Sequence, residues 1–112
     1  MKYQIILVPF PFDDFSATKV RPAVCLTNKI GSYNHVVIAF VSSQAALANE
    51  PSDLVLLDTD AGFPATGLKQ SSAIRLHKMV TIPSKAILRI LGKLPTAFQP
   101  ILSQKLKTLF DL

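Results

Sequence analysis

The chain has 112 residues, of which 49% are apolar, enough for the packed core of one domain without disulfides. The formal net charge of +5 favours an anionic partner, either a nucleic acid or an acidic protein segment. The single cysteine, Cys25, excludes an internal disulfide, and no apolar run is long enough to span a bilayer. No charged-then-apolar leader opens the sequence, so we expect one domain over residues 1–112 of a cytoplasmic protein with no membrane partner.

Short apolar runs separated by polar turns predict a mostly β chain. We expect strands at about residues 4–10, 20–27, 35–41, 53–57, 70–76 and 88–94. After His35, the run at 35–41 is apolar throughout, as in a strand buried on both faces. Pro9 and Pro11 cannot donate to a sheet ladder, so the first strand should end at a sheet edge or barrel corner, with Phe10 and Phe12 covering the core.

Alternation assigns side chains to faces in two of these strands. The second strand has one face with Val20, Val24 and Leu26 and another with Arg21, Ala23 and Cys25, unless Pro22 marks a bulge. The fifth strand has one face with Ser72, Ile74 and Leu76 and another with Ser71, Ala73, Arg75 and His77. Residues 80–82 continue this strand or pair again with the sheet.

A helix at about residues 97–110 closes the chain. Its apolar stripe consists of Phe98, Ile101, Leu102, Leu106, Leu109 and Phe110. Thr96 and Gln99 have the spacing of a capping box, and Pro100 lies in the first turn, where proline is tolerated. Several short strands and one amphipathic helix predict a small, partly open barrel that the helix plugs.

The residue types give only weak signals for a metal site. There is no cluster of cysteines and histidines with zinc spacing, and a carboxylate-bound magnesium is only weakly indicated by Asp and Glu residues in loops and at strand ends. RNA can be cut by its own 2′-OH if a protein orients the attack and neutralises the developing charge. Arg21 has the planar fork that suits a phosphate, although it can also form a surface ion pair with Asp13 or Asp14.

Three motifs resemble the PemK/MazF family of toxin endoribonucleases. The first is Leu-Val-Pro-Phe-Pro-Phe-Asp-Asp-Phe-Ser at residues 7–16, followed by Lys19 and by Arg-Pro-Ala-Val at 21–24. The second is Gly-Leu-Lys at 67–69, continued by Ser-Ala-Ile-Arg-Leu at 72–76, Lys78 and Val-Thr at 80–81. The third is Ile-Leu-Arg at 87–89 with Leu-Gly-Lys-Leu at 91–94. The motifs follow the family's order over nearly the whole chain.

The resemblance implies an SH3-like barrel of the CcdB/PemK type with a C-terminal helix, assembled as a homodimer. It also implies a toxin that cleaves single-stranded RNA without a metal or other cofactor and that binds a cognate acidic antitoxin. The family's catalytic arginine and hydroxyl correspond to Arg21, in the Arg-Pro motif, and Ser42, after the third strand. The expected substrate-binding residues are Lys19, Ser43, Gln44, Lys69, Ser72, Arg75 and His77.

Some positions keep alternatives open. Ser42 can instead cap its own turn, and His77 is expected to pack or support the site more than to transfer a proton. Tyr3-Gln4 replaces the family's usual Gly-Asp, and Val20 replaces a common basic residue. The alternative function is therefore a non-catalytic binding module, either an RNA-binding protein or a CcdB-like toxin that poisons gyrase. The choice of RNA base is expected to lie in loops such as 13–19 and 45–52.

The apolar residues at 5–12 and in the C-terminal stripe exceed what one thin core needs, which suggests a symmetric dimer. Its two-fold groove would gather four cations from each chain, Lys19, Arg21, Lys69 and Arg75.

Overall fold

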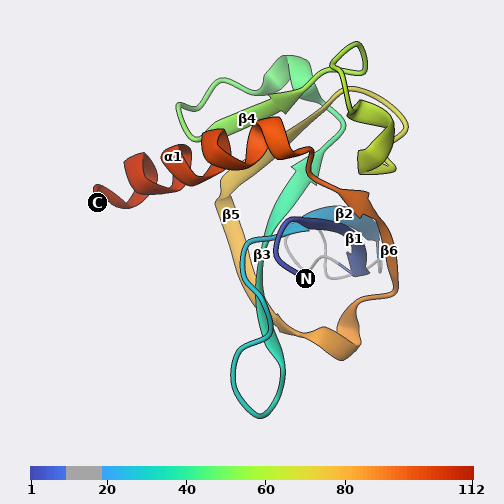
Figure 1. The fold of residues 1–112 in the computed structure, drawn as a ribbon, viewed down its shortest axis with the longest axis vertical. Coiled ribbons are helices and arrows are strands. Elements are labelled where there is room, and N and C mark those ends of the chain that lie inside the picture. Colours follow the sequence, from blue (N-terminus) through green and yellow to red (C-terminus); the bar gives the residue numbers. More distant parts are fainter. Residues whose placement is uncertain (10–18) are drawn as a thin grey trace.

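The computed structural model describes residues 1–9 and 19–112. Its strands are β1 (Gln4–Pro9), β2 (Val20–Cys25), β3 (His35–Ser42), β4 (Asp53–Leu56), β5 (Ser72–Pro83) and β6 (Arg89–Lys93). They form one antiparallel sheet in the order β4-β5-β3-β2-β1-β6, which curls into a half-barrel (Figure 1). Helix α1 (Gln99–Phe110) follows the last strand, and short 3-10 turns lie at Ala45–Leu47, Phe63–Thr66, Ser84–Ala86 and Thr96–Phe98. The predicted mostly β, partly open barrel with a C-terminal helix is confirmed.

The sheet buries apolar side chains on both of its faces. One cluster includes Val24, Leu26 and Ala39 and packs against Leu102 of α1. The other includes Ala23, Cys25 and Ile38. The predicted alternation in β2 and the two buried faces of β3 are therefore confirmed. Burial also raises the pKa of the Cys25 thiol to about 11, which keeps it neutral as a core side chain.

The predicted position of Pro9 at a sheet edge can be compared with the structure, whereas that of Pro11 cannot. Pro9 pairs with Val20 at the end of β1, two residues beyond Leu7, the last β1 residue paired with β6. At Pro9, β1 is therefore paired with β2 alone and forms an edge of the sheet, as expected for a residue that has no N–H to donate. Pro11, Phe10 and Phe12 lie outside the described residues, as do residues 13–18 of the predicted loop.

The start of the C-terminal helix differs from the prediction. The capping box between Thr96 and Gln99 is wrong, because a 3-10 turn precedes α1 and no side chain caps the helix. The Gln99 side-chain amide instead donates to the carbonyl of Leu94 at 3.1 Å. Pro100 does lie in the first turn of α1, as predicted.

Fewer apolar side chains remain outside the core than the sequence suggests. Ile5, Ile6 and Val8 are fully buried within their own chain, so in the described part of the 5–12 segment the half-buried Leu7 and the exposed Pro9 are the apolar side chains that remain accessible. In the helical stripe, Leu102 is buried, whereas Ile101 and Phe110 are 45% and 55% exposed. No helix among residues 1–9 and 19–112 is long and apolar enough to cross a membrane.

A register shift between β3 and β5 changes which β5 side chains lie near the end of β3. β5 pairs with β3 through Ala39–Met79 and then through Phe40–Arg75, so the register shifts between two successive residues of β3. Leu76, His77 and Lys78 of β5 lie between these two pairs and are not paired with β3. A bulge of this kind bends the strand and changes the direction of side chains relative to regular alternation.

Candidate functional site

A small cavity of about 210 Å³ lies where β2, β5 and the end of β3 meet. We call it the cationic pocket, and its lining residues are Arg21, Phe40, Ser42, Ser43, Gln44, Arg75 and Lys78. Three of these side chains are cations, and three others carry hydroxyl or amide groups that can donate hydrogen bonds. The lining therefore matches a small, oxygen-rich anion such as a phosphate group.

Arg21 and Lys78 reach the pocket over the same aromatic ring. The guanidinium carbon of Arg21 and the ammonium nitrogen of Lys78 each lie 5.6 Å from the centroid of the Phe40 ring. These distances are typical of cation–π contacts. Two cations held around one ring repel each other, so an anion that binds between them is stabilised by both.

A buried carboxylate positions the third cation. Arg75 Nε donates to Asp53 Oδ1 at 2.7 Å, and the two side chains are 17% and 2% exposed. Asp53 Oδ2 in turn accepts a hydrogen bond from the backbone N–H of Glu50 at 3.0 Å. Because the ion pair uses Nε, it fixes the plane of the guanidinium while the group still lines the cationic pocket.

Ser42 both forms a local turn and lines the cationic pocket. Its Oγ accepts a hydrogen bond from the backbone N–H of Gln44 at 3.1 Å, as a turn-forming serine does. The same residue ends β3 and lines the cationic pocket. An oxygen that accepts this bond still carries a hydroxyl hydrogen, which can donate to an anion in the pocket.

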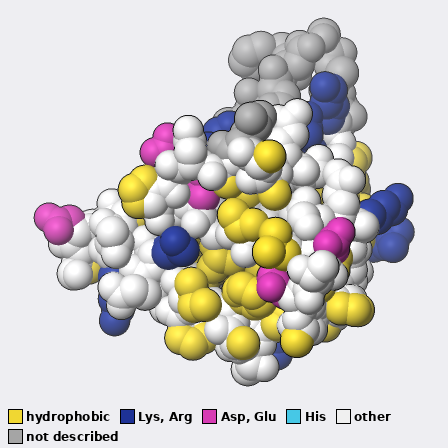
Figure 2. Space-filling view, turned by 90° about the horizontal axis from the view of Figure 1, so that it is seen from above, with side chains coloured by type: hydrophobic (Ala, Val, Ile, Leu, Met, Phe, Trp, Pro, Cys, Tyr) yellow, Lys and Arg dark blue, Asp and Glu magenta, His cyan; other side chains and the backbone are white. Residues whose placement is uncertain are grey.

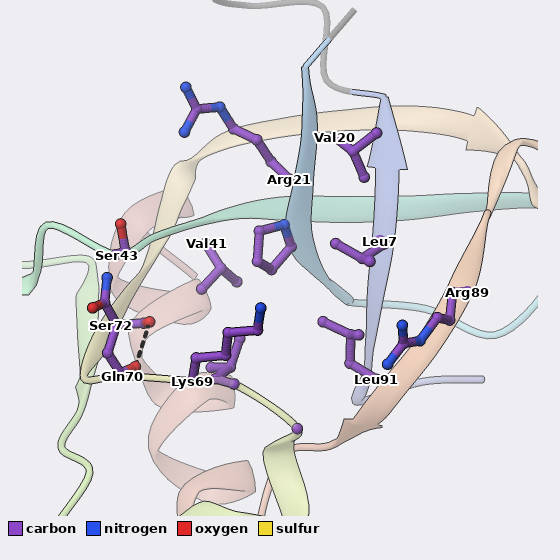
Figure 3. Close-up of a pocket in the computed structure, with 13 residues that line it drawn as sticks. Leu7, Val20, Arg21, Val41, Ser43, Lys69, Gln70, Ser72, Arg89 and Leu91 are labelled. Carbon is purple, nitrogen blue, oxygen red and sulfur yellow. Dashed lines mark hydrogen bonds between the residues drawn. The ribbon is translucent and has the colours of Figure 1, made fainter.

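A larger cavity of about 440 Å³ adjoins the cationic pocket (Figure 3). We call it the apolar pocket, because its lining includes the apolar side chains of Leu7, Pro22, Val41, Leu68 and Leu91. The remaining lining residues are Val20, Arg21, Ser43, Gly67, Lys69, Gln70, Ser72 and Arg89. Arg21 and Ser43 line both cavities, so the two spaces share a wall.

The structure brings most of the predicted site residues together. Arg21, Ser42, Ser43, Gln44 and Arg75 line the cationic pocket, and Lys69 and Ser72 line the apolar pocket. Ser72 is buried, and its hydroxyl donates to the carbonyl of Gln70 at 2.9 Å. This bond holds Gln70 in place at the apolar pocket.

Lys19 and His77 are not brought to either pocket. Lys19 is exposed just before β2. His77 shares Asp53 with Arg75, at 3.8 Å from Nδ1 to Oδ1, but it lines a separate cavity with Glu50 and Thr108. This position agrees with a packing or supporting role more than with proton transfer at the cationic pocket.

Among the polar, charged and aromatic residues described in the two pockets, four had no predicted role. Lys78 and Phe40 belong to the cationic pocket, and Gln70 and Arg89 belong to the apolar pocket. Regular alternation would place Lys78 on the opposite face from Arg75, and only the bulge brings it to the same pocket. Within residues 1–9 and 19–112, no three His, Cys, Asp or Glu side chains form a group that could hold a metal ion.

The fold and the two pockets define a half-barrel protein with a small cavity lined by cationic and hydroxyl side chains. Residues 1–110 match the family described as the PemK-like, MazF-like toxin of type II toxin–antitoxin systems. The chain belongs to this family, and it is a toxin of the PemK/MazF type.

Solved structures share the fold. The chain is similar to the Mycobacterium tuberculosis toxin MazF-mt6, with a TM-score of 0.74, 21% identity and 97% of each chain covered. It is also similar to an endoribonuclease in complex with its cognate antitoxin from a mycobacterial species, with a TM-score of 0.71 and 15% identity over 100% of this chain and 95% of the other. A comparison with curated protein sequences gives no match.

Proposed function

We propose that this toxin is a metal-independent endoribonuclease that cleaves single-stranded RNA, with residues 1–112 acting as one domain. The observation that carries the proposal is the cationic pocket, which Arg21, Arg75 and Lys78 line together with Ser42. Family membership supports the toxin role, and one structural relative is described as an endoribonuclease in complex with its antitoxin.

The reaction would be an internal transesterification. The 2′-oxygen of the RNA forms a bond to the adjacent phosphorus, the bond from phosphorus to the 5′-oxygen breaks, and the products end in a 2′,3′-cyclic phosphate and a 5′-hydroxyl. The 2′-OH loses a proton and the 5′-oxygen gains one. Negative charge grows on the phosphoryl oxygens in the transition state, and Arg21 and the Ser42 hydroxyl would stabilise it.

The charge of the pocket also supports a reaction without a divalent metal. Arg21, Arg75 and Lys78 line it, Arg75 being paired with Asp53, and no carboxylate is among the lining residues that the structure describes. Such a lining repels a divalent cation and attracts the phosphate directly. The role that a metal plays in other nucleases, neutralising the phosphoryl oxygens, would fall here to the guanidinium of Arg21.

Cleavage of RNA in the presence of EDTA tests this function. Purified protein should cut a single-stranded RNA in excess EDTA, and the same strand annealed to its complement should be protected. A strict requirement for magnesium would contradict the proposal. Binding of RNA without cleavage under any condition would instead support the alternative, a non-catalytic binding module on this fold.

An acidic antitoxin is the proposed protein partner, and it should compete with RNA. The net charge of +5 attracts polyanions of either kind, and a disordered acidic segment can fold as it binds. We also propose a homodimer, for which the exposed apolar side chains of Ile90, Ile101 and Phe110 provide contact surface.

Competition and assembly can be measured together. Sedimentation of the purified chain should show a dimer at micromolar concentration, and a peptide from the cognate antitoxin should displace labelled RNA with a steep dependence on salt. A stable monomer would exclude the dimer. A ternary complex that still cleaves RNA would show that the antitoxin binds a different face.

A further inference from the structure

We propose that the apolar pocket is a nucleobase subsite that selects a keto base, uracil or guanine, next to the cleaved phosphate. This inference rests on the proposed function, because it assigns the neighbouring cationic pocket to the phosphate. A nucleotide has an anionic group and a flat, largely apolar base joined by a sugar. The two cavities reproduce this division, and they share Arg21 and Ser43 as a common wall.

The interior of the pocket suits the faces of a base. Figure 3 shows Leu7, Val41 and Leu91 directed into one space from three different strands, β1, β3 and β6. The cavity of about 440 Å³ lies in the range of small-molecule sites. An open apolar cavity beside a cationic surface gains stability when an unstacked base fills it and displaces water.

The pocket is held open by backbone contacts, so it exists before a ligand binds. Gly67 has a φ of 72°, and a Cβ atom there would lie 2.1 Å from the carbonyl oxygen of Leu91. A Cβ atom on Gly92 would lie 2.2 Å from the carbonyl oxygen of Ala65. The segment before β5 and strand β6 therefore pack backbone to backbone, and this contact fixes one wall of the pocket.

The polar and charged residues of the apolar pocket, which we call its rim, determine which bases fit. Lys69 and Arg89 extend toward the cavity from opposite sides and can only donate hydrogen bonds (Figure 3). Gln70 and Ser43 can both donate and accept, and the described residues that line the pocket include no carboxylate. Guanine offers the acceptors O6 and N7, and uracil carries O4 where thymine does, whereas adenine and cytosine present an amino group at the equivalent edge. A rim rich in donors therefore favours the keto bases.

Binding to two RNAs that differ only at this edge tests the proposal. Short oligo(U) and oligo(C) with 2′-O-methyl sugars cannot be cleaved by their own 2′-oxygen, and their bases differ chiefly in O4 against the N4 amino group. The wild-type protein should bind oligo(U) about five-fold more tightly than oligo(C), or more, in fluorescence anisotropy. Lys69→Gln and Arg89→Gln should each reduce this ratio toward one.

Lys107→Gln is the matched control. Lys107 is exposed on α1, lines neither pocket, and its replacement removes the same charge. It should weaken binding to both RNAs equally and leave the ratio unchanged. All three side chains are exposed, so unfolding temperatures should match the wild type.

Two outcomes would overturn the subsite. One is equal affinity of the wild type for the two RNAs, and the other is an equal loss of the ratio in the Lys107 variant. Because the assay measures binding alone, it separates this inference from the proposed reaction. A protein that never cleaves RNA but keeps a Lys69-dependent preference would refute the endoribonuclease and retain the subsite.

Discussion

Replacing Arg21 with alanine is expected to reduce RNA cleavage by on the order of a thousand-fold or more, the scale seen when an arginine that stabilises a phosphoryl transition state is removed. The guanidinium lies in the cationic pocket over Phe40, and the other guanidinium of the pocket, that of Arg75, already donates through Nε to Asp53. Arg21→Lys should also lose most activity, because a point charge does not reproduce the fork. Cleavage of a fluorogenic single-stranded RNA measures both.

The fold should survive this change. Arg21 is half-buried, and loss of its contact with Phe40 should lower the free energy of unfolding by about 1 kcal/mol. Lys29→Ala is a suitable control, since it removes one charge from the exposed turn between β2 and β3, which projects away from the site (Figure 1). An Arg21→Ala protein that cuts RNA at the wild-type rate would refute the assignment.

Ser42→Ala is expected to slow cleavage by about 100-fold to 1,000-fold. This is the usual effect of removing one preorganised donor to a developing oxyanion. Ser42→Thr keeps both the hydroxyl and the acceptor for the Gln44 N–H, so it should retain most activity. Initial rates at saturating RNA would measure the effect on the chemical step.

The control for Ser42 is Ser103→Ala, which removes a hydroxyl from α1, away from the cationic pocket. It should leave the rate unchanged. If Ser42→Ala and Ser42→Thr lose activity equally, the serine acts through the backbone turn at the end of β3 and not through its hydroxyl.

The sheet was predictable where side chains follow a strict period of two. In β2, burial of Ala23 and Cys25 in one cluster and of Val24 in the other matches the alternation of the sequence. The apolar run of β3 is likewise buried on both faces. Local polar signals were less reliable, because Thr96 and Gln99 have capping-box spacing without forming one.

The candidate site was predictable in part. Arg21 and Ser42 were placed by resemblance to a family, since their residue types alone also fit an ion pair and a turn. Lys78 could not be placed, because no residue type indicates the register shift between Ala39 and Phe40 that brings it to the cationic pocket.

The apolar pocket was missed for a different reason. Its lining comes from β1, β2, β3, β6, the first residue of β5 and the segment before it, which are far apart in the sequence. Such a cavity depends on how the sheet curls and on the close contact of Gly67 with Leu91. Neither feature can be predicted from a local sequence pattern.

The mass of the cleavage products tests the central claim most directly. A single-stranded RNA of defined sequence, incubated with the protein in EDTA, should yield an upstream fragment that ends in a 2′,3′-cyclic phosphate, one water lighter than a linear phosphate. The downstream fragment should begin with a 5′-hydroxyl. Fragments with a 5′-phosphate, or intact RNA in EDTA together with cleavage in magnesium, would contradict the reaction that we assign to Arg21 and Ser42.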